Sequence, residues 1–460
     1  MNELESIDPF SEALLQRYSV ETDDEISRKL TFAQQAQREW SRSDINHRVK
    51  VLRNLKSTLD ERKQSLAEII TREMGKPFNQ SISEIEKCAW VCDYYADHAE
   101  SLLSPREIST DYERSIVAYE PLGVILAIMP WNFPFWQVFR FLAPSILAGN
   151  SIVLKHASNV TGCALAIENC LQFLDLPKAL LQVLRIQSKQ VASIIEDRRI
   201  SGVTLTGSTQ AGKAVAKIAG ENLKKSVLEL GGSDPYLILE DADLDRAADA
   251  CVTSRLINSG QSCIAAKRFI TVASIYDEFR EKLIEHFKAK KFGNPMDPEN
   301  SIGPMARLDL RDELHQQVTA SVEKGAQLDL GGEVPKMKGY FYPPTVLSGV
   351  TPDHPAFHEE LFGPVACLIQ ARSTDHAIEL ANQTVYGLGA AVFTKNLDLG
   401  FEIAQKRLQA GCCFVNEFVK SDPRLPFGGI KESGYGRELS EEGIREFMNI
   451  KTVVVKSTKT

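Results

Sequence analysis

A single cysteine and a separate carboxylate are the residues of this sequence best suited to chemistry. Cys263 closes the polar, glycine-containing run 258–263, and Glu229 lies upstream, just before two glycines. A thiolate is a strong nucleophile toward a carbonyl carbon, and a carboxylate can activate the water that later releases an acyl group from sulfur. The pair therefore fits covalent catalysis on a carbonyl. Inert packing is the alternative for Cys263, since most buried cysteines behave as small apolar residues.

A possible anion site begins at Gly207, where a predicted strand gives way to a predicted helix. The backbone amides and positive end of such a helix attract anions. Gly207, Gly212 and Lys213 have the spacing of a P-loop, but Ala214 stands where a Ser or Thr must hold magnesium. The usual dinucleotide fingerprint G-x-G-x-x-G is also missing. Phosphate binding and a plain strand-turn-helix both stay open at this point.

Composition excludes several classes of protein. The 460 residues are 43% hydrophobic and 25% charged, with a net charge of −8, so we expect no nucleic-acid partner. The acidic N-terminus lacks a basic and apolar signal, and the apolar run 124–130 is too short to span a membrane. Nine cysteines, an odd number without zinc-type spacing, predict reduced thiols and no metal. We therefore expect a cytoplasmic enzyme without a membrane partner.

The elements that must position these residues alternate between strand and helix. Residues 24–106 are charge-rich, with apolar residues at helical spacing. Short apolar segments then alternate with amphipathic ones, which is typical of a parallel, doubly wound sheet. The predicted strands are 115–120, 123–130, 151–155 and 200–206, and the predicted helices are 135–147, 161–173 and 210–220.

A second alternating run begins near residue 228 and predicts a second α/β domain. Its predicted helices are 244–258, 276–289, 310–324 and 374–383, and its predicted strands are 269–272, 364–369 and 390–394. Two apolar segments, 115–120 and 452–456, fit neither domain. They form either a sheet edge within one domain or strands that pair with another subunit, and we favour the second.

Six blocks in the same order as here occur in the aldehyde dehydrogenase family, which this sequence resembles over nearly its whole length. They are Pro130–Pro134, Thr206–Ser208, Glu229–Gly232, Asn258–Cys263, Glu359–Pro364 and Pro426–Gly434. The resemblance implies two doubly wound α/β domains and a small β-extension, and a homodimer or homotetramer. It places the cofactor-binding domain in 1–102 and 122–230, with 433–445 packing back on it, the catalytic domain in 231–432, and the oligomerisation strands in 103–121 and 446–460.

The resemblance also implies roles for individual residues. Cys263 attacks the aldehyde, while the Asn132 side chain and the Cys263 backbone N–H form the oxyanion hole. Glu229 then activates water to hydrolyse the thioester. The cofactor-binding positions that match are Trp131, Lys155, Gly207, Ser208, Leu230, Glu360 and Phe362.

Two departures from the family bear on the cofactor and on protons. Ser158 occupies the position of a Glu that holds the 2′-hydroxyl of NAD in many relatives. Ser removes a charge that would repel a 2′-phosphate, so we expect NADP to be preferred, with NAD possible. Phe141 replaces a Lys that relays protons with the counterpart of Glu438. We therefore assign Glu438 no catalytic role.

The substrate is predicted from Arg140, eight residues after Asn132 on the following helix. The position resembles that of succinate-semialdehyde dehydrogenases, in which an Arg pairs with the substrate carboxylate. Ser421 is the matching loop serine, while Ile257 replaces a second Arg, and we expect Phe135 and Phe418 to line the tunnel. Oxidation of succinate semialdehyde to succinate is the leading hypothesis. A longer ω-semialdehyde such as glutarate semialdehyde, an NAD-preferring enzyme and a catalytically idle relative are the alternatives.

Overall fold

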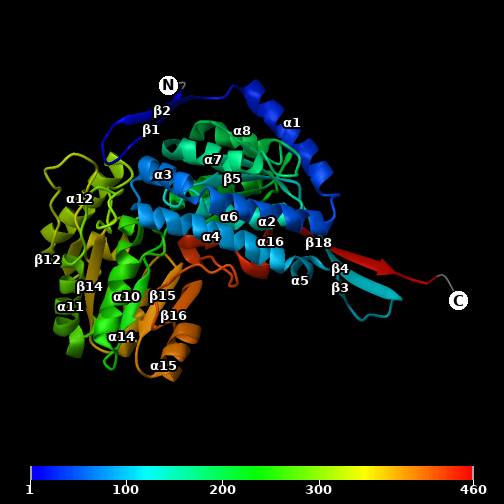
Figure 1. Cartoon of the computed structure of the whole chain (residues 1–460). Coiled ribbons are helices and arrows are strands. Elements are labelled where there is room, and N and C mark those ends of the chain that lie inside the picture. Colours follow the sequence, from blue (N-terminus) through cyan, green and yellow to red (C-terminus); the bar gives the residue numbers. More distant parts are fainter. Residues whose placement is uncertain (1–2, 458–460) are drawn as a thin grey trace.

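Three sheets organise the chain in the computed structural model, which describes residues 3–457 (Figure 1). Residues 1–2 and 458–460, the extreme ends of the first and last predicted segments, lie outside the described residues. Two large sheets are mostly parallel, and a small antiparallel sheet projects from one side of the molecule. Two mostly parallel α/β sheets with a small β-extension are the architecture predicted from the sequence.

The first large sheet has six strands in the order β17-β9-β8-β5-β6-β7, and only β17 is antiparallel to its neighbour. Its carboxyl ends meet at one edge, where β5 gives way to Trp131 and β9 ends on Glu229. In chain order its strands are β5 (Val124–Met129), β6 (Ser151–His156), β7 (Leu181–Val183), β8 (Ile200–Thr206), β9 (Lys225–Glu229) and β17 (Gly434–Tyr435).

Helices cover both faces of this sheet because its strands are apolar on both sides. In β5, Ile125 and Ala127 face one core cluster, whereas Val124 and Leu126 face another. The first cluster is closed by α2 (Ile45–Glu61), α3 (Lys63–Met74), α4 (Phe78–Asp97), α6 (Trp136–Ala148), α7 (Thr161–Leu171) and the short α5 (Ala99–Leu103). The second is closed by α1 (Asp23–Trp40), α8 (Val191–Glu196) and α9 (Thr209–Glu221).

The second large sheet has seven strands in the order β12-β13-β14-β11-β10-β15-β16, and only β12 is antiparallel. The strands are β10 (Pro235–Ile238), β11 (Arg268–Val272), β12 (Gln327–Leu330), β13 (Thr345–Ser348), β14 (Val365–Ala371), β15 (Gly389–Phe393) and β16 (Cys412–Val415). The accompanying helices are α10 (Leu244–Leu256), α11 (Tyr276–Lys288), α12 (Leu308–Glu323), α13 (Pro355–His358), α14 (Thr374–Asn382) and α15 (Leu397–Glu402).

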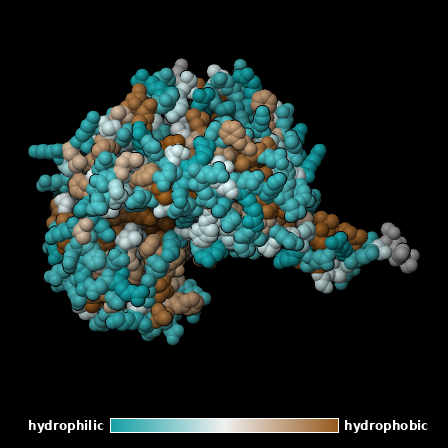
Figure 2. All heavy atoms as spheres, viewed as in Figure 1, coloured by the Kyte–Doolittle hydropathy of each residue, from teal (hydrophilic) through white to brown (hydrophobic). Residues whose placement is uncertain are grey.

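The projecting sheet joins the two apolar segments that fit neither domain. β18 (Met448–Val455) pairs antiparallel with β4 (Arg114–Pro121), and β3 (Arg106–Glu107) pairs with the other edge of β4. Helix α16 (Ser440–Glu446) leads into β18. Apolar side chains are exposed on this arm, as Figure 2 shows beside the main body. The segments thus pair with each other, and one edge of β18 has no partner strand among the described residues.

The structure adds elements that the sequence patterns did not predict. β1 (Glu3–Ile7) and β2 (Leu14–Ser19) form a hairpin, and Ser6 donates a 2.7 Å hydrogen bond to Glu73 of α3. One predicted boundary also moves: the helix predicted over 244–258 ends at Leu256. Asn258 and Ser259 beyond it have positive φ values of 54° and 55°, which no α-helix accommodates.

Candidate active site

Cys263 lies where two cavities meet. One cavity, of about 510 Å³, runs along the carboxyl edge of the six-stranded sheet. The other, of about 240 Å³, lies between α4, α6 and the loop after β16. Cys263 and Gln137 line both cavities. A ligand in either cavity can therefore lie beside Cys263.

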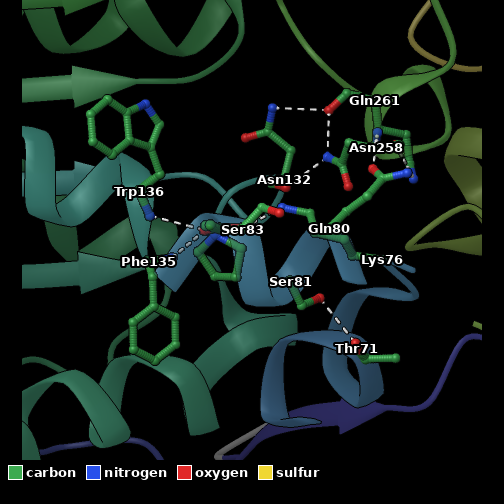
Figure 3. Close-up of polar contacts among 12 residues, drawn as sticks. Thr71, Lys76, Gln80, Ser81, Ser83, Asn132, Phe135, Trp136, Asn258 and Gln261 are labelled. Atoms are coloured by element: carbon green, nitrogen blue, oxygen red, sulfur yellow. Dashed lines mark hydrogen bonds and ion pairs between the residues drawn. The ribbon is translucent and has the colours of Figure 1, made fainter. Parts of the chain in front are cut away.

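The turn that carries Cys263 is held in a strained conformation by Asn258. Its side chain donates hydrogen bonds to the backbone oxygens of Asn132 (2.7 Å) and Gln261 (2.9 Å). Asn132 in turn donates from Nδ2 to the same Gln261 oxygen at 3.1 Å (Figure 3). Left-handed backbone at non-glycine residues costs about 1–3 kcal/mol and persists only where the surroundings enforce it. These bonds tie the nucleophile turn to Asn132, the predicted oxyanion donor.

Burial controls the ionisation of Cys263. Desolvation raises the pKa of the thiol to about 12, while the positive charges of Arg140 and Lys267 act in the opposite direction. Lys267 is fully buried and donates to the backbone oxygens of Cys263 (2.6 Å) and Ser262 (3.0 Å). The resting residue is thus a thiol, and a positive environment is in place to favour the thiolate.

Glu229 lies at the end of β9 and is buried, with neither carboxyl oxygen hydrogen-bonded. Burial raises its pKa, with the charge of Arg140 opposing the rise and that of Glu438 adding to it. Glu229 packs against Gly428, where a Cβ would come within 2.8 Å of its Oε1. It lines neither cavity, so a rotation of its side chain is needed before it can meet water beside Cys263.

The larger cavity collects six of the predicted cofactor residues. It is lined by Trp131, Gly207, Ser208, Leu230, Glu360 and Phe362, together with Asn132 and Cys263. Ser208 caps the start of α9 and accepts a hydrogen bond from Ala211, which leaves the first turn of the helix facing the cavity. The rings of Trp131 and Phe362 are nearly perpendicular, and their centroids are 5.7 Å apart.

The donors and acceptors of this cavity fit a dinucleotide. The helix N-terminus suits phosphate groups, and the Glu360 carboxylate suits sugar hydroxyls. Glu360 is held by the Gly232 amide at 3.0 Å and by Lys267 at 3.5 Å. Lys155 is the last but one residue of β6 and Ser158 lies two residues beyond the end of the strand, so both lie near the same carboxyl edge, although neither lines this cavity. Tyr386, which the sequence did not single out, lines it as well.

The smaller cavity contains three of the four predicted substrate residues. Arg140, Phe418 and Ser421 line it, but Phe135 does not. The Phe135 ring is fully buried and lies parallel to Phe139 in the core (Figure 3 shows it directed away from Asn132). Phe133 and Trp136 line the cavity instead. At the N-terminus of α6, Glu84 accepts hydrogen bonds from the backbone N–H groups of both Phe135 and Trp136 and so fixes the backbone from which the two rings project.

Arg140 is engaged by protein groups within this cavity. Its guanidinium forms a buried ion pair with Glu438, donates to Thr206 at 3.1 Å, and lies 5.1 Å from the centre of the Phe427 ring. Sequence reasoning missed a second cation there: Lys87 of α4 donates to Ser421 Oγ at 2.8 Å. The signal was present in the spacing of Gln80, Ser83, Glu84 and Lys87, which places all four on one face of a helix.

Residues 3–457 show neither a membrane-spanning helix nor a metal centre. No helix there combines the length and apolar character that crossing a bilayer requires. No group of three or more His, Cys, Asp and Glu side chains in the same residues is arranged to hold a metal ion.

A half-buried cysteine between a dinucleotide-sized cavity and a short polar-ended one is the arrangement expected of an oxidoreductase that works through a thiol. The chain belongs to the aldehyde dehydrogenase family, whose model matches residues 1–453. It is 47% identical to succinate semialdehyde dehydrogenase [NAD(P)+] Sad of Escherichia coli strain K12, over 94% of this chain and 93% of that one. It is 45% identical to a probable succinate-semialdehyde dehydrogenase [NADP(+)] of Synechocystis, over 97% and 98% of the two chains.

A solved relative has the same fold. The crystal structure of succinic semialdehyde dehydrogenase from Streptococcus pyogenes, in complex with NADP+, superposes with a TM-score of 0.96 at 38% identity and covers 99% of this chain and 100% of its own. The fold and the order of the sequence blocks therefore agree with the family.

Proposed function

We propose that this protein oxidises succinate semialdehyde to succinate with NADP+ as the preferred oxidant. The observation that carries the proposal is the smaller cavity, which combines Cys263 and Ser421 with three cationic side chains, Arg140, Lys87 and Lys420. An aldehyde that ends in a carboxylate matches this combination. Relatives at 45–47% identity bear the same activity in their names.

Cys263 and Asn132 perform the first half of the reaction. The Cys263 thiol gives its proton to solvent water and its sulfur bonds to the aldehyde carbon, while the electron pair of the carbonyl bond moves to the oxygen and makes it an oxyanion. One Asn132 Nδ2 hydrogen is committed to Gln261, which leaves the second for this oxyanion together with the Cys263 backbone N–H. When bound, the dinucleotide accepts a hydride from the same carbon.

Glu229 completes the reaction after its side chain turns toward Cys263. Its carboxylate takes a proton from water, whose oxygen adds to the acyl carbon and displaces the Cys263 sulfur. The products are the carboxylic acid and the regenerated thiol. A buried carboxyl whose pKa is raised is a stronger base once deprotonated, which suits this task.

Ser158 and Lys155 support the choice of NADP+. Both lie near the carboxyl edge of β6. They would hold the adenosine half of a dinucleotide bound in the larger cavity. Ser158 offers a hydroxyl in place of a carboxylate, and Lys155 supplies a positive charge.

The arm of β3, β4 and β18 supports a proposal on assembly. We propose that the chain forms a homo-oligomer, a dimer or a tetramer, through this sheet. Ile450, Val453, Val454 and Val455 are exposed on β18, beside an edge that another copy can extend.

The activity is tested by steady-state rates with each dinucleotide on succinate semialdehyde, glutarate semialdehyde and butanal. We expect the highest kcat/KM with succinate semialdehyde and NADP+, and no turnover by Cys263→Ala. A preference for butanal would contradict the carboxylate specificity, and a preference for glutarate semialdehyde would reassign the chain length. Inactivity of the wild type with all three would indicate a catalytically idle relative.

A further inference from the structure

Lys87 is the cation of the smaller cavity that no acidic side chain neutralises. Within the part of the chain that the structure describes, no carboxylate forms an ion pair with its Nζ. Nζ donates to Ser421 Oγ at 2.8 Å and lies 4.4 Å from the centre of the Trp136 ring. The other two cations of the cavity are already paired, Arg140 with Glu438 and Lys420 with Glu417. An anion entering this cavity therefore finds its unmatched positive charge at Lys87.

The charges around Lys87 are occupied by other partners. Glu84, one turn earlier on α4, is paired with the buried Lys76 and accepts two backbone amides at the start of α6. Asp422, from the loop after β16, is held by Arg424 at 2.6 Å. Cys88 on the same helix is a buried thiol with a raised pKa. Lys87 is partly buried, and removing an ammonium from water without a counter-ion is costly unless a ligand supplies one.

We infer that Lys87 Nζ, together with Ser421 Oγ, binds the terminal carboxylate of the substrate and sets the preference for ω-semialdehydes. The inference rests on the proposed function. It changes the residue that binds the substrate carboxylate from Arg140, as the sequence predicted, to Lys87 of α4. Arg140 then serves mainly to neutralise Glu438 and to keep a positive charge near Cys263. Lys87 is a specificity-determining residue and takes no part in bond making.

Burial makes this anchor sensitive to pH. Desolvation, and secondarily the charge of Arg140, lowers the pKa of Lys87 to about 8, while Cys88, Asp422 and Glu84 oppose the change. Raising the pH through this value removes the proton and with it the charge that attracts a carboxylate. The binding of an uncharged aldehyde does not depend on this charge. The ratio of kcat/KM for succinate semialdehyde to kcat/KM for butanal therefore falls as the pH rises through about 8. Ionisation of Cys263 affects both substrates alike and cancels in the ratio.

The test compares Lys87→Met with the wild type on succinate semialdehyde and butanal. Met keeps the length of the side chain and removes the charge, so we expect kcat/KM for succinate semialdehyde to fall about 10- to 100-fold, mainly through KM. Butanal should change less than about threefold, because it makes no charge-assisted bond. Lys87→Arg should restore part of the loss, and the pH dependence of the ratio should vanish in Lys87→Met.

Lys63→Met is the matched control, because Lys63 also contacts α4, through Glu86, but lies outside the cavity. It should leave both rates unchanged. Equal losses toward both aldehydes in Lys87→Met, or a selective loss in Arg140→Met alone, would overturn the inference while leaving the proposed activity intact. A wild-type enzyme that prefers butanal would instead refute the activity itself. Thermal unfolding of each variant separates a folding defect from a binding defect.

Discussion

Burial governs the reactivity of the single residues in this site. Cys263 has a pKa raised to about 12 by desolvation, and Glu229 has a raised pKa for the same reason. In the proposed mechanism both groups lose a proton before they act, so we expect both to gain activity as the pH rises. Lys87 behaves in the opposite way, because its lowered pKa removes its charge as the pH rises.

The ionisation of Cys263 is measured by alkylation of the free enzyme with iodoacetamide. Only the thiolate reacts, so we expect the rate to rise about tenfold per pH unit between about pH 7 and about pH 9. Mass spectrometry of the peptide that contains Cys263 follows the reaction separately from Cys412 and Cys413, and Cys263→Ala should lose this signal. A rate that levels off near neutral pH would show that Arg140 and Lys267 outweigh burial.

Arg140 is expected to contribute to stability through its buried partner. Removal of the guanidinium in Arg140→Met leaves the Glu438 carboxylate buried without its cation, at a cost of about 3–5 kcal/mol in the free energy of unfolding. The pKa of Glu438 is already raised by burial and then rises further above its unfolded value. The variant should therefore lose more stability at pH 8 than at pH 5, where the protonated form is accessible.

Urea unfolding of Arg140→Met, Glu438→Gln and the double variant checks this prediction. Glu438→Gln should recover part of the stability lost in Arg140→Met, because the amide carries no charge to desolvate. Additive losses in the double variant would mean that the ion pair contributes nothing to folding.

At the scale of elements, the parallel strands and their helices could be predicted, because each is specified by its own local pattern. The two-sided apolar runs of β5 and β8 and the Gly149 cap of α6, with φ of 98°, are examples. The β1–β2 hairpin was missed because its charged, mostly exposed strands lack such a pattern. The kink after Leu256 was missed as well, since its positive φ values depend on hydrogen bonds from Asn258 to distant backbone.

The site was predictable only in part, for a related reason. Motif residues such as Cys263 and Asn132 have types and spacings that imply their chemistry. Lys87 carries no such motif, and its role depends on the packing of α4 against the loop that holds Ser421. Phe135 and Trp136 are adjacent, and which ring lines the cavity depends on how the start of α6, held by Glu84, is packed in three dimensions.

The position of Ser158 after β6 yields a prediction for the cofactor. Ser158→Glu places a carboxylate where a 2′-phosphate is expected, so the ratio of kcat/KM for NADP+ to kcat/KM for NAD+ should fall at least about tenfold. Steady-state rates with both dinucleotides measure it. Ser193→Glu adds the same charge to an exposed position on α8 and should leave the ratio unchanged. An unaltered ratio in Ser158→Glu would remove the argument for NADP+ from this residue.

For the whole molecule, the projecting arm is the feature that a single chain does not explain. Ile450 and Val454 are 59% and 43% exposed on β18. We expect Ile450→Asp with Val454→Asp to convert the proposed oligomer into smaller species, because charge on an apolar strand opposes burial against another copy. Light scattering after size-exclusion chromatography gives the mass. Asn449→Asp on the same strand is the control, and a wild-type monomer would refute the assembly.

The placement of Cys263 on a wall shared by two cavities has a consequence for turnover. We expect the acid to depart through its own cavity while the spent nucleotide still occupies the neighbouring one. Their separate affinities, and no fixed sequence of steps, would then set the order in which the two molecules leave.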